Sequence, residues 1–433
     1  MNGNSNIFKN KKILIYGLGR SGISSFNFLK KFNNIFLFDD NKNIKLNNII
    51  RNKLISLDQI KKINFDLIIL SPGININQCK LKYFLRKKFK IIYTDLDIFY
   101  SFYKNLCITI TGTNGKSTSC QLLYEVLKKD GHDVRLAGNI GYPVLSIKNI
   151  KKKSIFVIEA SSYQLDYSKL FTSKYAAILN ISPDHLERHK SLKNYISAKL
   201  KLIRNQKKNS IAFINKHNDY LKKEIKKNKY ESKIIKINTE LKDKVVNSFQ
   251  NKIFKSKSNR ENLAFIIEIS KKLKIKKKIL NEAIKNFKGL KYRQQVIFEN
   301  KNISIINDSK STSYSSTIEM LKKSKNIYWL LGGIPKKGDK FNLSKKYFKN
   351  IKVFIFGKNY QKFSVDLRNK IKFKKFANLK DALSEVFYNI KNENSLKKTI
   401  LFSPAAASFD SFKNFEDRGV YFNNLVKKYL DDQ

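Results

Sequence analysis

Short runs of apolar residues alternate with longer amphipathic, lysine-rich stretches along the whole chain. Each run has the length of a buried strand, and each amphipathic stretch suits a helix that covers a sheet. This alternation predicts βαβ units with mostly parallel sheets, so the expected fold class is α/β. The runs expected to form strands are Ile13–Tyr16, Ile35–Phe38, Leu67–Leu70, Cys107–Ile110, Ile155–Ile158, Ala176–Leu179, Ile211–Ile214, Ile303–Ile306, Ile327–Leu331, Val353–Phe356 and Thr399–Phe402.

Glycine punctuation after an expected strand occurs at three places, Gly17–Gly22, Gly112–Gly115 and Gly332–Gly333. The chain has 433 residues, enough for two to four domains of about 100–200 residues. Together these features indicate three α/β domains. The expected domains span residues 1–96, 97–288 and 289–433.

The chain is strongly basic, with 88 Lys and Arg against 34 Asp and Glu and a formal net charge of +54. Such an excess is typical of proteins that bind nucleic acid, which is therefore the alternative from another functional class. Only 10 of the basic residues are arginine, however, and the lysines are dispersed along the chain. Because a nucleic-acid surface would cluster arginine and stacking aromatic residues, we expect no specific nucleic-acid partner.

Cysteine spacing and apolar content bear on where the protein works. The three cysteines, Cys79, Cys107 and Cys120, show no CxxC spacing, so neither a disulfide framework nor a zinc ribbon is favoured. No stretch approaches the roughly 20 apolar residues of a membrane span, and the first apolar run is too short for a signal peptide. We expect a soluble, cytoplasmic protein without membrane insertion.

The strongest local motif is a candidate phosphate-binding loop directly after the expected strand at 107–110. Glycines let backbone N–H groups close around a phosphate, and the following helix presents its positive end. Lys116 can neutralise the β and γ oxygens, and the Ser117 hydroxyl can reach a bound Mg²⁺. The loop is shortened, since Ile110 stands where the standard pattern has glycine. The residues of the loop are Gly112, Thr113, Asn114, Gly115, Lys116, Ser117 and Thr118.

A second nucleotide-type turn, Gly17–Gly22, lies between an expected strand and an expected helix. Asp39 and Asp40 end the next strand, where a dinucleotide-binding fold places its ribose-binding acid. An NAD-dependent dehydrogenase would explain this turn but would leave the Lys116 loop without a role. The turn therefore indicates a nucleotide-like site more strongly than it indicates NAD.

Three further polar residues follow strands of the same central region. Glu159 comes after the strand at 155–158, where a second carboxylate for a nucleotide-bound Mg²⁺ belongs. Asp184 and His185 come after the strand at 176–179. Because ligands bind beyond the carboxyl ends of parallel strands, His185 is a candidate site residue.

Four central segments occur in an order found in a known family: Thr111–Thr118, Glu159–Leu165, Asn180–His185 and Tyr195–Lys199. Together they resemble the central domain of the Mur ligases. The C-terminal third is similar to the branch of that family that adds D-glutamate, and the N-terminal turns fit as well, so the resemblance covers essentially the whole chain. The segments that carry this second likeness are Asn307–Thr312, Leu330–Gly333, Ser403–Gly419, Gly17–Gly22 and Ser71–Ile74.

The resemblance implies a Rossmann-like N-terminal domain for a UDP-sugar, a central P-loop ATPase-like domain, and a Rossmann-like C-terminal domain for an amino acid. The implied activity is an ATP-dependent amide ligation in peptidoglycan precursor synthesis. ATP would phosphorylate the L-alanyl carboxylate of UDP-N-acetylmuramoyl-L-alanine, and the amine of D-glutamate would attack the acyl phosphate. We expect the enzyme to be a monomer.

The same resemblance implies roles for five residues in the chemical step. Lys116 would stabilise charge on the transferring phosphoryl group, with Ser117 and Glu159 holding a first Mg²⁺. A second Mg²⁺ would be held by Glu159, His185 and a carbamylated Lys199. The Tyr-x-x-Ala-Lys context distinguishes Lys199 from the neighbouring lysines.

Binding residues are implied residue by residue. Asn259, Asn262 and Arg293 would contact ATP. The UDP-sugar would be held by Gly17, Leu18, Gly19, Arg20, Asp39, Ser71, Pro72, Gly73, Asn139 and Gln164. D-Glutamate would be held by Lys310, Thr312, Lys336, Ser408, Phe409 and Phe415, with two lysines for two carboxylates.

Two departures from the family pattern affect no acid, base or metal ligand. Ser258 precedes Asn259 where the family usually has histidine, and Lys291-Tyr292 replaces a Pro-His pair. Within the same class of enzyme, another Mur ligase or a folylpolyglutamate-type ligase is the alternative. The segment Ser403–Gly419 and the Gly17–Gly22 turn argue against both.

Overall fold

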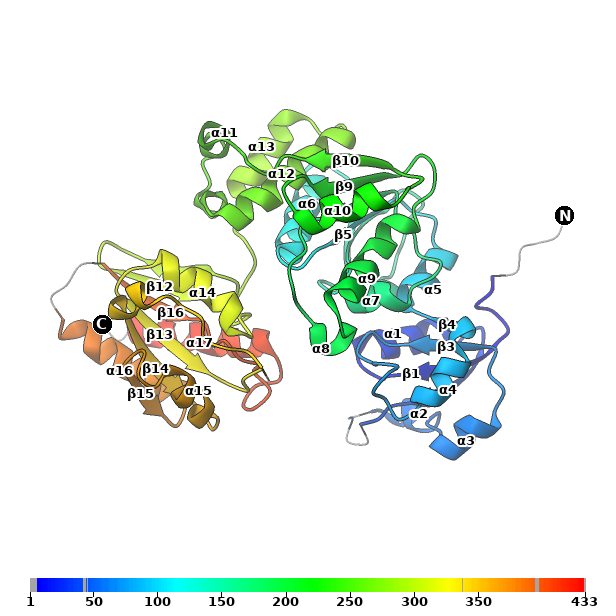
Figure 1. Ribbon diagram of the computed structural model, residues 1–433, viewed down its shortest axis with the longest axis horizontal. Helices are drawn as coiled ribbons and strands as arrows, with labels where there is room; N and C mark the ends of the chain where they lie inside the picture. The colour runs from blue at the N-terminus through cyan, green and yellow to red at the C-terminus, as the bar shows by residue number, and fades with distance from the viewer. Residues whose placement is uncertain (1–5, 42–43, 45, 337, 394–396, 432–433) are drawn as a thin grey trace. The chain divides into compact units, whose positions relative to one another are not determined.

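The computed structural model describes residues 6–41, 44, 46–336, 338–393 and 397–431. It divides into two compact units, Met1–Lys288 and Gly289–Gln433. The first unit contains two sheets and the second contains one, each flanked by helices (Figure 1). The predicted α/β class is confirmed, because every strand pair except one is parallel within the described residues.

The first sheet has the strand order β2-β1-β3-β4. The strand order changes side at β1: β2 lies on one side of it, and β3 and β4 lie on the other. In Rossmann-like folds, ligands bind in the crevice beyond the carboxyl ends of the two strands at such a point, here β1 and β3. Its elements are β1 (Lys12–Tyr16), α1 (Arg20–Leu29), β2 (Asn34–Phe38), α2 (Asn48–Arg51), α3 (Leu57–Lys62), β3 (Leu67–Leu70), α4 (Lys82–Lys87), β4 (Ile92–Tyr93) and α5 (Asp95–Phe102).

The second sheet has six parallel strands in the order β10-β9-β8-β5-β7-β6. Its central strands β5, β7 and β8 are almost entirely buried, which explains their continuous apolar sequences. The elements are β5 (Cys107–Thr111), α6 (Lys116–Lys129), β6 (Val134–Gly138), β7 (Ile155–Glu159), α7 (Ser162–Tyr167), β8 (Tyr175–Ile178), α8 (Leu186–His189), α9 (Leu192–Arg204), β9 (Ile211–Asn215), α10 (Asp219–Lys227), β10 (Lys233–Ile237), α11 (Asp243–Ser248), α12 (Lys257–Lys272) and α13 (Lys277–Asn286).

The third sheet forms the second unit, with the order β11-β12-β16-β13-β14-β15. Only β11 pairs antiparallel, with β12, among the described strands. The elements are β11 (Gln295–Glu299), β12 (Ile303–Asn307), α14 (Tyr314–Lys323), β13 (Ile327–Gly332), β14 (Ile351–Phe356), α15 (Tyr360–Leu367), β15 (Phe373–Phe376), α16 (Leu379–Lys391), β16 (Lys398–Phe402) and α17 (Phe415–Asp431).

All eleven strands predicted from apolar runs are present, to within two residues at either end. Five further strands, β4, β6, β10, β11 and β15, were not predicted, and each lies at an edge of its sheet. An edge strand is solvated along one side and tolerates lysine, so its sequence need not carry the continuous apolar run that the edge strand β2 has. The sequence of β10, KIIKI, is an example.

The first two sheets form one unit because α5 joins them. The Asp97 carboxylate, fully buried, accepts hydrogen bonds from the Ser168 hydroxyl at 2.8 Å and from the amides of Lys169, Leu170 and Phe171 at 2.7 to 3.0 Å. Phe99 of the same helix packs on Phe156 of β7, with ring centroids 4.8 Å apart. The domain boundary expected after residue 96 falls inside α5, and both sides of it belong to one compact unit. This boundary therefore stays a prediction.

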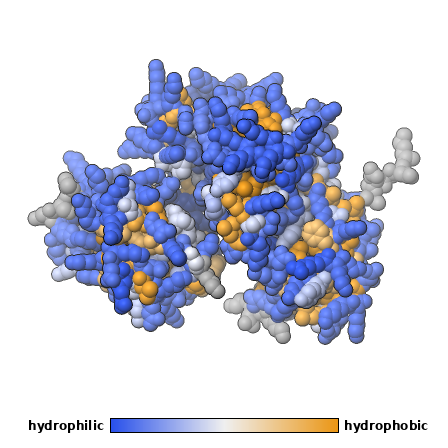
Figure 2. Space-filling view, viewed as in Figure 1, coloured by the Kyte–Doolittle hydropathy of each residue, from blue (hydrophilic) through white to orange (hydrophobic). Residues whose placement is uncertain are grey.

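The cores of this strongly basic chain are built mainly from apolar residues, and the polar side chains lie mostly at the surface. Figure 2 shows hydrophilic residues over most of the visible face of each unit, with smaller apolar areas among them. None of the helices in the described part of the chain is both long and apolar enough to span a membrane.

Candidate active site

The phosphate loop connects β5 to α6 and depends on two glycines with positive φ. Gly112 has φ 157° and Gly115 has φ 83°. A Cβ at Gly115 would lie 2.0 Å from the Asn262 side-chain oxygen, so α12 packs directly on the loop. Asn262 in turn donates to Asn259 at 3.4 Å. The structure therefore brings both predicted ATP-contacting asparagines to the phosphate loop.

A second strand end supports the loop from the other side. The backbone N–H of Asn114 donates to the Asn180 side chain at 2.9 Å, and the Thr113 N–H donates to the Asn180 carbonyl at 3.0 Å. The Thr113 hydroxyl lies 3.0 Å from the hydroxyl of Tyr195 in α9. These contacts fix the loop before any ligand binds.

Two lysines converge on the carbonyl of Gly112. Lys116 Nζ donates to this oxygen at 2.9 Å and to the Thr113 carbonyl at 2.8 Å, and Lys199 Nζ donates to the Gly112 oxygen at 2.8 Å. Lys199 is only 2% exposed. Burial, followed by the charge of Lys116, holds the pKa of Lys199 well below its usual range, which favours the neutral amine.

Glu159 ends β7 beside these lysines and is 1% exposed. Its Oε1 accepts a hydrogen bond from the Asn139 side chain at 2.6 Å. Its Oε2 is buried and has no hydrogen-bond partner among the described residues. A buried carboxylate oxygen without a donor is a suitable ligand for a hard cation such as Mg²⁺.

His185 occupies a left-handed backbone position, with φ 54°, immediately before α8. Its Nδ1 lies 3.0 Å from the Tyr163 hydroxyl, and its Nε2 lies 3.4 Å from Asp184 Oδ2. Burial raises the pKa of Tyr163 to about 12, so this hydroxyl stays protonated at neutral pH. The sequence reasoning assigned no role to Tyr163, although it lies in the Glu159–Leu165 segment, because the sequence does not show which side chain its hydroxyl meets.

The metal ligands expected from sequence do not form an all-protein cage. In the described part of the chain, no group of three or more His, Cys, Asp and Glu side chains could hold a metal ion. Glu159 and Asp184 nevertheless both act electrostatically on Lys199, which places these groups around one space. Ser117, in the first turn of α6, is 3% exposed. The residues fit a cation that is bound partly by nucleotide oxygens.

The N-terminal turn is closed by its own hydrogen bonds. The Leu18 N–H donates to Asp39 Oδ2 at 2.6 Å, and the Ser71 hydroxyl donates to the Gly17 carbonyl at 2.6 Å. A Cβ at Gly22 would lie 1.8 Å from the Gly17 oxygen, which explains that glycine. The structure thus brings Leu18, Asp39 and Ser71 together around one turn.

Residues from both sheets of the first unit reach this turn. Arg20 donates to the Gly141 carbonyl at 3.1 Å, two residues beyond Asn139. The Pro72 carbonyl accepts from Arg188 at 3.4 Å, while Gly73 is exposed. Gln164 is 5% exposed, and its side-chain oxygen accepts from the Ser161 N–H in the cap of α7. The substrate contacts expected of these residues stay a prediction.

In the second unit, Lys310 and Phe415 are in contact, with Nζ 3.8 Å from the ring centroid. Arg418, fully buried, donates to the carbonyls of Ser309 and Ala406 at 2.7 and 2.9 Å. This guanidinium holds the 307–312 loop against the 403–408 loop. Arg418 had no assigned role in the sequence analysis, although it lies inside the long C-terminal motif.

The other residues expected to bind D-glutamate lie on nearby loops of the unit. Ile334 and Ala407 form a β-bridge that joins the loop carrying Lys336 to the loop carrying Ser408. The backbone N–H of Tyr314, two residues after Thr312, donates to Asp339 at 2.6 Å, which ties Thr312 to the same loop. Phe409 is 71% exposed, as expected for a ligand contact better than for a core residue.

Asp308 is a buried acid between these loops. It accepts from the Ser403 hydroxyl at 2.8 Å and from the Gln294 N–H at 3.1 Å. Burial raises the pKa of Asp308 to about 7, although the nearby Arg293 and Arg418 oppose the shift.

The departure from the family pattern at Tyr292 has a structural reason, because a Cβ at Gly419 would lie 2.4 Å from the Tyr292 ring. The tyrosine fills the space that this glycine leaves.

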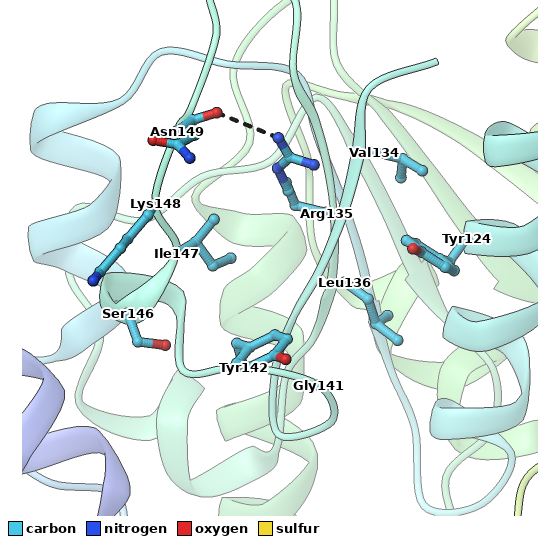
Figure 3. A pocket seen from close by; sticks show the side chains of 10 residues that line it. All are labelled: Tyr124, Val134, Arg135, Leu136, Gly141, Tyr142, Ser146, Ile147, Lys148 and Asn149. Carbon is cyan, nitrogen blue, oxygen red and sulfur yellow. Dashed lines mark hydrogen bonds between the residues drawn. The ribbon is translucent and has the colours of Figure 1, made fainter. Parts of the chain in front are cut away.

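A cavity of about 560 Å³ opens at the outer edge of the second sheet (Figure 3). Arg135 of β6 faces it and donates to the Asn149 carbonyl at 3.3 Å. The cavity is formed by Tyr124, Val134, Arg135, Leu136, Gly141, Tyr142, Ser146, Ile147, Lys148 and Asn149. None of the residues predicted to bind ATP, Mg²⁺ or substrate lines it.

Two family models match the chain. The Mur ligase middle domain matches residues 110–287, and the N-terminal domain of Mur ligase MurD-like proteins matches residues 11–93. These two ranges contain the phosphate loop and the Gly17–Gly22 turn, respectively.

Relatives match at full length. The UDP-N-acetylmuramoylalanine--D-glutamate ligase of Rickettsia prowazekii is 36% identical, over 98% of this chain and 99% of its own length. The protein of the same name from Buchnera aphidicola subsp. Schizaphis graminum is 38% identical, over 96% of this chain and 98% of its own length.

Solved structures share the fold. The UDP-N-acetylmuramate-alanine ligase of Thermotoga maritima gives a TM-score of 0.55 at 17% identity, covering 98% of this chain and all of that one. The MurF ligase of the same organism, solved in complex with ADP, gives a TM-score of 0.55 at 14% identity with the same coverage. At these identities the likeness supports the fold alone.

Proposed function

The chain belongs to the Mur ligase family, and from this premise we propose that it joins D-glutamate to UDP-N-acetylmuramoyl-L-alanine with conversion of ATP to ADP and phosphate. The relatives that match its full length carry the name of that ligase. The observation that carries the proposal is the pairing of a preformed phosphate loop with two buried groups, Lys199 and Glu159, at its mouth.

The reaction needs a carboxylate to become an electrophile. In the first step a substrate carboxylate oxygen bonds to the γ-phosphorus and ADP leaves. In the second step the D-glutamate amine bonds to the acyl carbon, the amine loses a proton, and phosphate leaves. Lys116 supplies fixed positive charge beside the phosphate loop, where the transferring phosphoryl group gains charge.

Mg²⁺ would neutralise the phosphate oxygens during the transfer. Ser117 and Glu159 would hold one ion, and Glu159, His185 and Lys199 would hold a second. The unpartnered Oε2 of Glu159 supports both assignments.

Lys199 can join this set only as an anion. Its lowered pKa leaves a neutral amine, whose lone pair can attack CO₂ to form a carbamate and release one proton. The carbamate would add two oxygen ligands in a space that now contains a lysine nitrogen beside a carbonyl. The proposal therefore includes carbamylation of Lys199.

In the second unit, Lys310 and Lys336 would each face one carboxylate of D-glutamate, with Phe415 under Lys310 and Thr312, Ser408 and Phe409 beside them. Arg293 would contact ATP from the segment that begins this unit. We further propose that the enzyme acts as a monomer in the cytoplasm, with no specific nucleic-acid partner.

The test is phosphate release from ATP in the presence of UDP-N-acetylmuramoyl-L-alanine. We expect release to require D-glutamate and to be absent with L-glutamate, L-alanine or meso-diaminopimelate. Equal rates without an amino acid, or dependence on one of the others, would contradict the proposal. Steep loss of DNA binding with salt, together with no phosphate release, would favour the nucleic-acid alternative.

A further inference from the structure

An aromatic cluster surrounds His185 and reaches the phosphate loop. Its other members are Tyr163 of α7, His189 of α8 and Tyr195 of α9, and α9 is packed against both other helices (Figure 1). The ring centroids of Tyr163 and His185 are 5.0 Å apart, and those of His189 and Tyr195 are 5.4 Å apart. Tyr195 also meets the Thr113 hydroxyl at 3.0 Å. Packing of this kind restricts how the imidazole of His185 can rotate.

One hydrogen bond inside the cluster distinguishes the two nitrogens of His185. Nδ1 lies 3.0 Å from the Tyr163 hydroxyl and 3.6 Å from Glu187 Oε1, whereas Nε2 lies on the side of Asp184, 3.4 Å from its Oδ2. A nitrogen that binds a cation must offer its lone pair. Because Tyr163 contacts Nδ1, a cation bound by His185 takes Nε2. Nδ1 then carries the proton, and its N–H donates a hydrogen bond to the Tyr163 hydroxyl oxygen.

Tyr163 is itself held by a buried arginine. The guanidinium carbon of Arg188 lies 5.0 Å from the ring centroid of Tyr163 and 5.3 Å from that of Tyr167. Arg188 is 8% exposed and donates to the Pro72 carbonyl at 3.4 Å. A stack between a desolvated guanidinium and two rings stabilises one arrangement of all three groups. The arginine thus connects the turn at 71–73 to the tyrosine that contacts His185.

We propose that Tyr163 is a positioning residue for His185, and that Arg188 holds Tyr163 in place from the 71–73 turn. The hydroxyl fixes the rotamer and the tautomer of the imidazole so that Nε2 faces the space beside Asp184 and Glu159. This inference rests on the proposed function, in which His185 binds Mg²⁺. It assigns a role to two residues that the reaction itself does not require.

The test compares Tyr163→Phe with Tyr167→Phe. Both variants keep a ring under Arg188, but only Tyr163→Phe removes the hydroxyl at Nδ1. We expect Tyr163→Phe to weaken Mn²⁺ binding to the ADP-loaded protein, followed by electron paramagnetic resonance, by about 10–100-fold. We also expect kcat to fall by a similar factor, while KM for the UDP-sugar stays within about twofold of wild type. Tyr167→Phe should match wild type in all three measurements.

A spectroscopic readout separates positioning from a merely structural role. The chain has four histidines, so a long-range ¹H–¹⁵N spectrum of the protein with Mg²⁺ and ADP contains four imidazole patterns, and His185→Asn identifies one of them. The proposal expects an Nδ1–H tautomer for His185 in wild type and in Tyr167→Phe, and a changed tautomer balance in Tyr163→Phe.

Three results would overturn the inference. An active wild type in which Tyr163→Phe behaves like Tyr167→Phe removes the positioning role alone. Lost activity with unchanged Mn²⁺ affinity and tautomer does the same, because it points to general damage. A wild type without D-glutamate-dependent phosphate release instead defeats the proposed function, and the inference falls with it.

Discussion

The two glycine turns of the first unit look alike in sequence but differ in how their polar groups are satisfied. At the N-terminal turn, Asp39 accepts the Leu18 N–H and Ser71 donates to the Gly17 carbonyl, so the turn closes on itself. At the phosphate loop, by contrast, Lys199 is buried with a lowered pKa, and a buried oxygen of Glu159 has no hydrogen-bond partner in the part of the chain that the structure describes. The backbone groups of Gly17 and Leu18 at the first turn are thus paired within the protein, whereas a buried Glu159 oxygen beside the second loop has no donor among the described residues.

This difference suggests that the phosphate loop takes part in the chemical step and the N-terminal turn in substrate binding. Buried groups that lack partners cost free energy in the free protein, and they are retained where a ligand or metal compensates them. Substitutions at the phosphate loop should therefore change kcat, and substitutions at the N-terminal turn should change stability or substrate affinity.

The largest effect is expected for Lys199→Ala. Removing the carbamate that we propose at Lys199 should lower kcat by about 10³-fold. Added formate or acetate should restore part of the rate, because a small carboxylate can replace the carbamate. Phosphate release measures both. Lys193→Ala, on the exposed side of the same helix, is the control, and an unchanged Lys199→Ala would remove the carbamate role.

A pH test extends the comparison to the second unit. There the pKa of Asp308 is raised although its carboxylate accepts two hydrogen bonds. Its folded pKa of about 7 lies above the ordinary value of 3.8, so its contribution to stability is full below pH 3.8 and is lost as pH rises through 7. The loss amounts to about 4 kcal/mol. Calorimetry of the full chain between pH 4 and pH 8 should show the second unit melting earlier as pH rises. Asp308→Asn should flatten that dependence, and an equally steep slope in the variant would assign it to another group.

A smaller effect is expected at the closed turn. Gly22→Ala places a Cβ 1.8 Å from the Gly17 oxygen, so backbone must move, and we expect a loss of about 3 kcal/mol in the free energy of unfolding. A Cβ in Gly19→Ala meets no atom within 4 Å, so this variant should unfold at the wild-type urea concentration. Urea unfolding of both variants checks this. Equal stability of the two would show that the turn is looser than its contacts indicate.

The smallest effect is expected for Asp39→Asn. The amide keeps an acceptor for the Leu18 N–H but loses the charge that strengthens the 2.6 Å bond. We expect KM for the UDP-sugar to rise about tenfold, the equivalent of about 1.4 kcal/mol, with kcat unchanged. Steady-state kinetics measures the split, and a fall in kcat alone would place Asp39 in the chemical step instead.

The sequence alone determined the α/β class, ten interior strands and one edge strand, β2, of the described residues, and the order of the motifs. It could do so because a strand buried on both faces must be apolar throughout, and a phosphate loop must carry glycine at positive φ. The glycines of Gly112–Gly115 and the lysine after them were identified for that reason. The same reasoning failed for the other edge strands, since the solvated side of β10 or β15 accepts lysine.

Only the tertiary structure decided which polar groups are buried and what they meet. Lys199 is one lysine among 78 in the sequence, and its pKa is lowered because α9 buries it against Gly112 and near Lys116. Tyr163 and Arg418 lie inside sequence motifs, but their partners, like those of Arg188, became known only from contacts between segments far apart along the chain. Desolvation depends on that packing, so charge state and partner choice become readable only when the chain is folded.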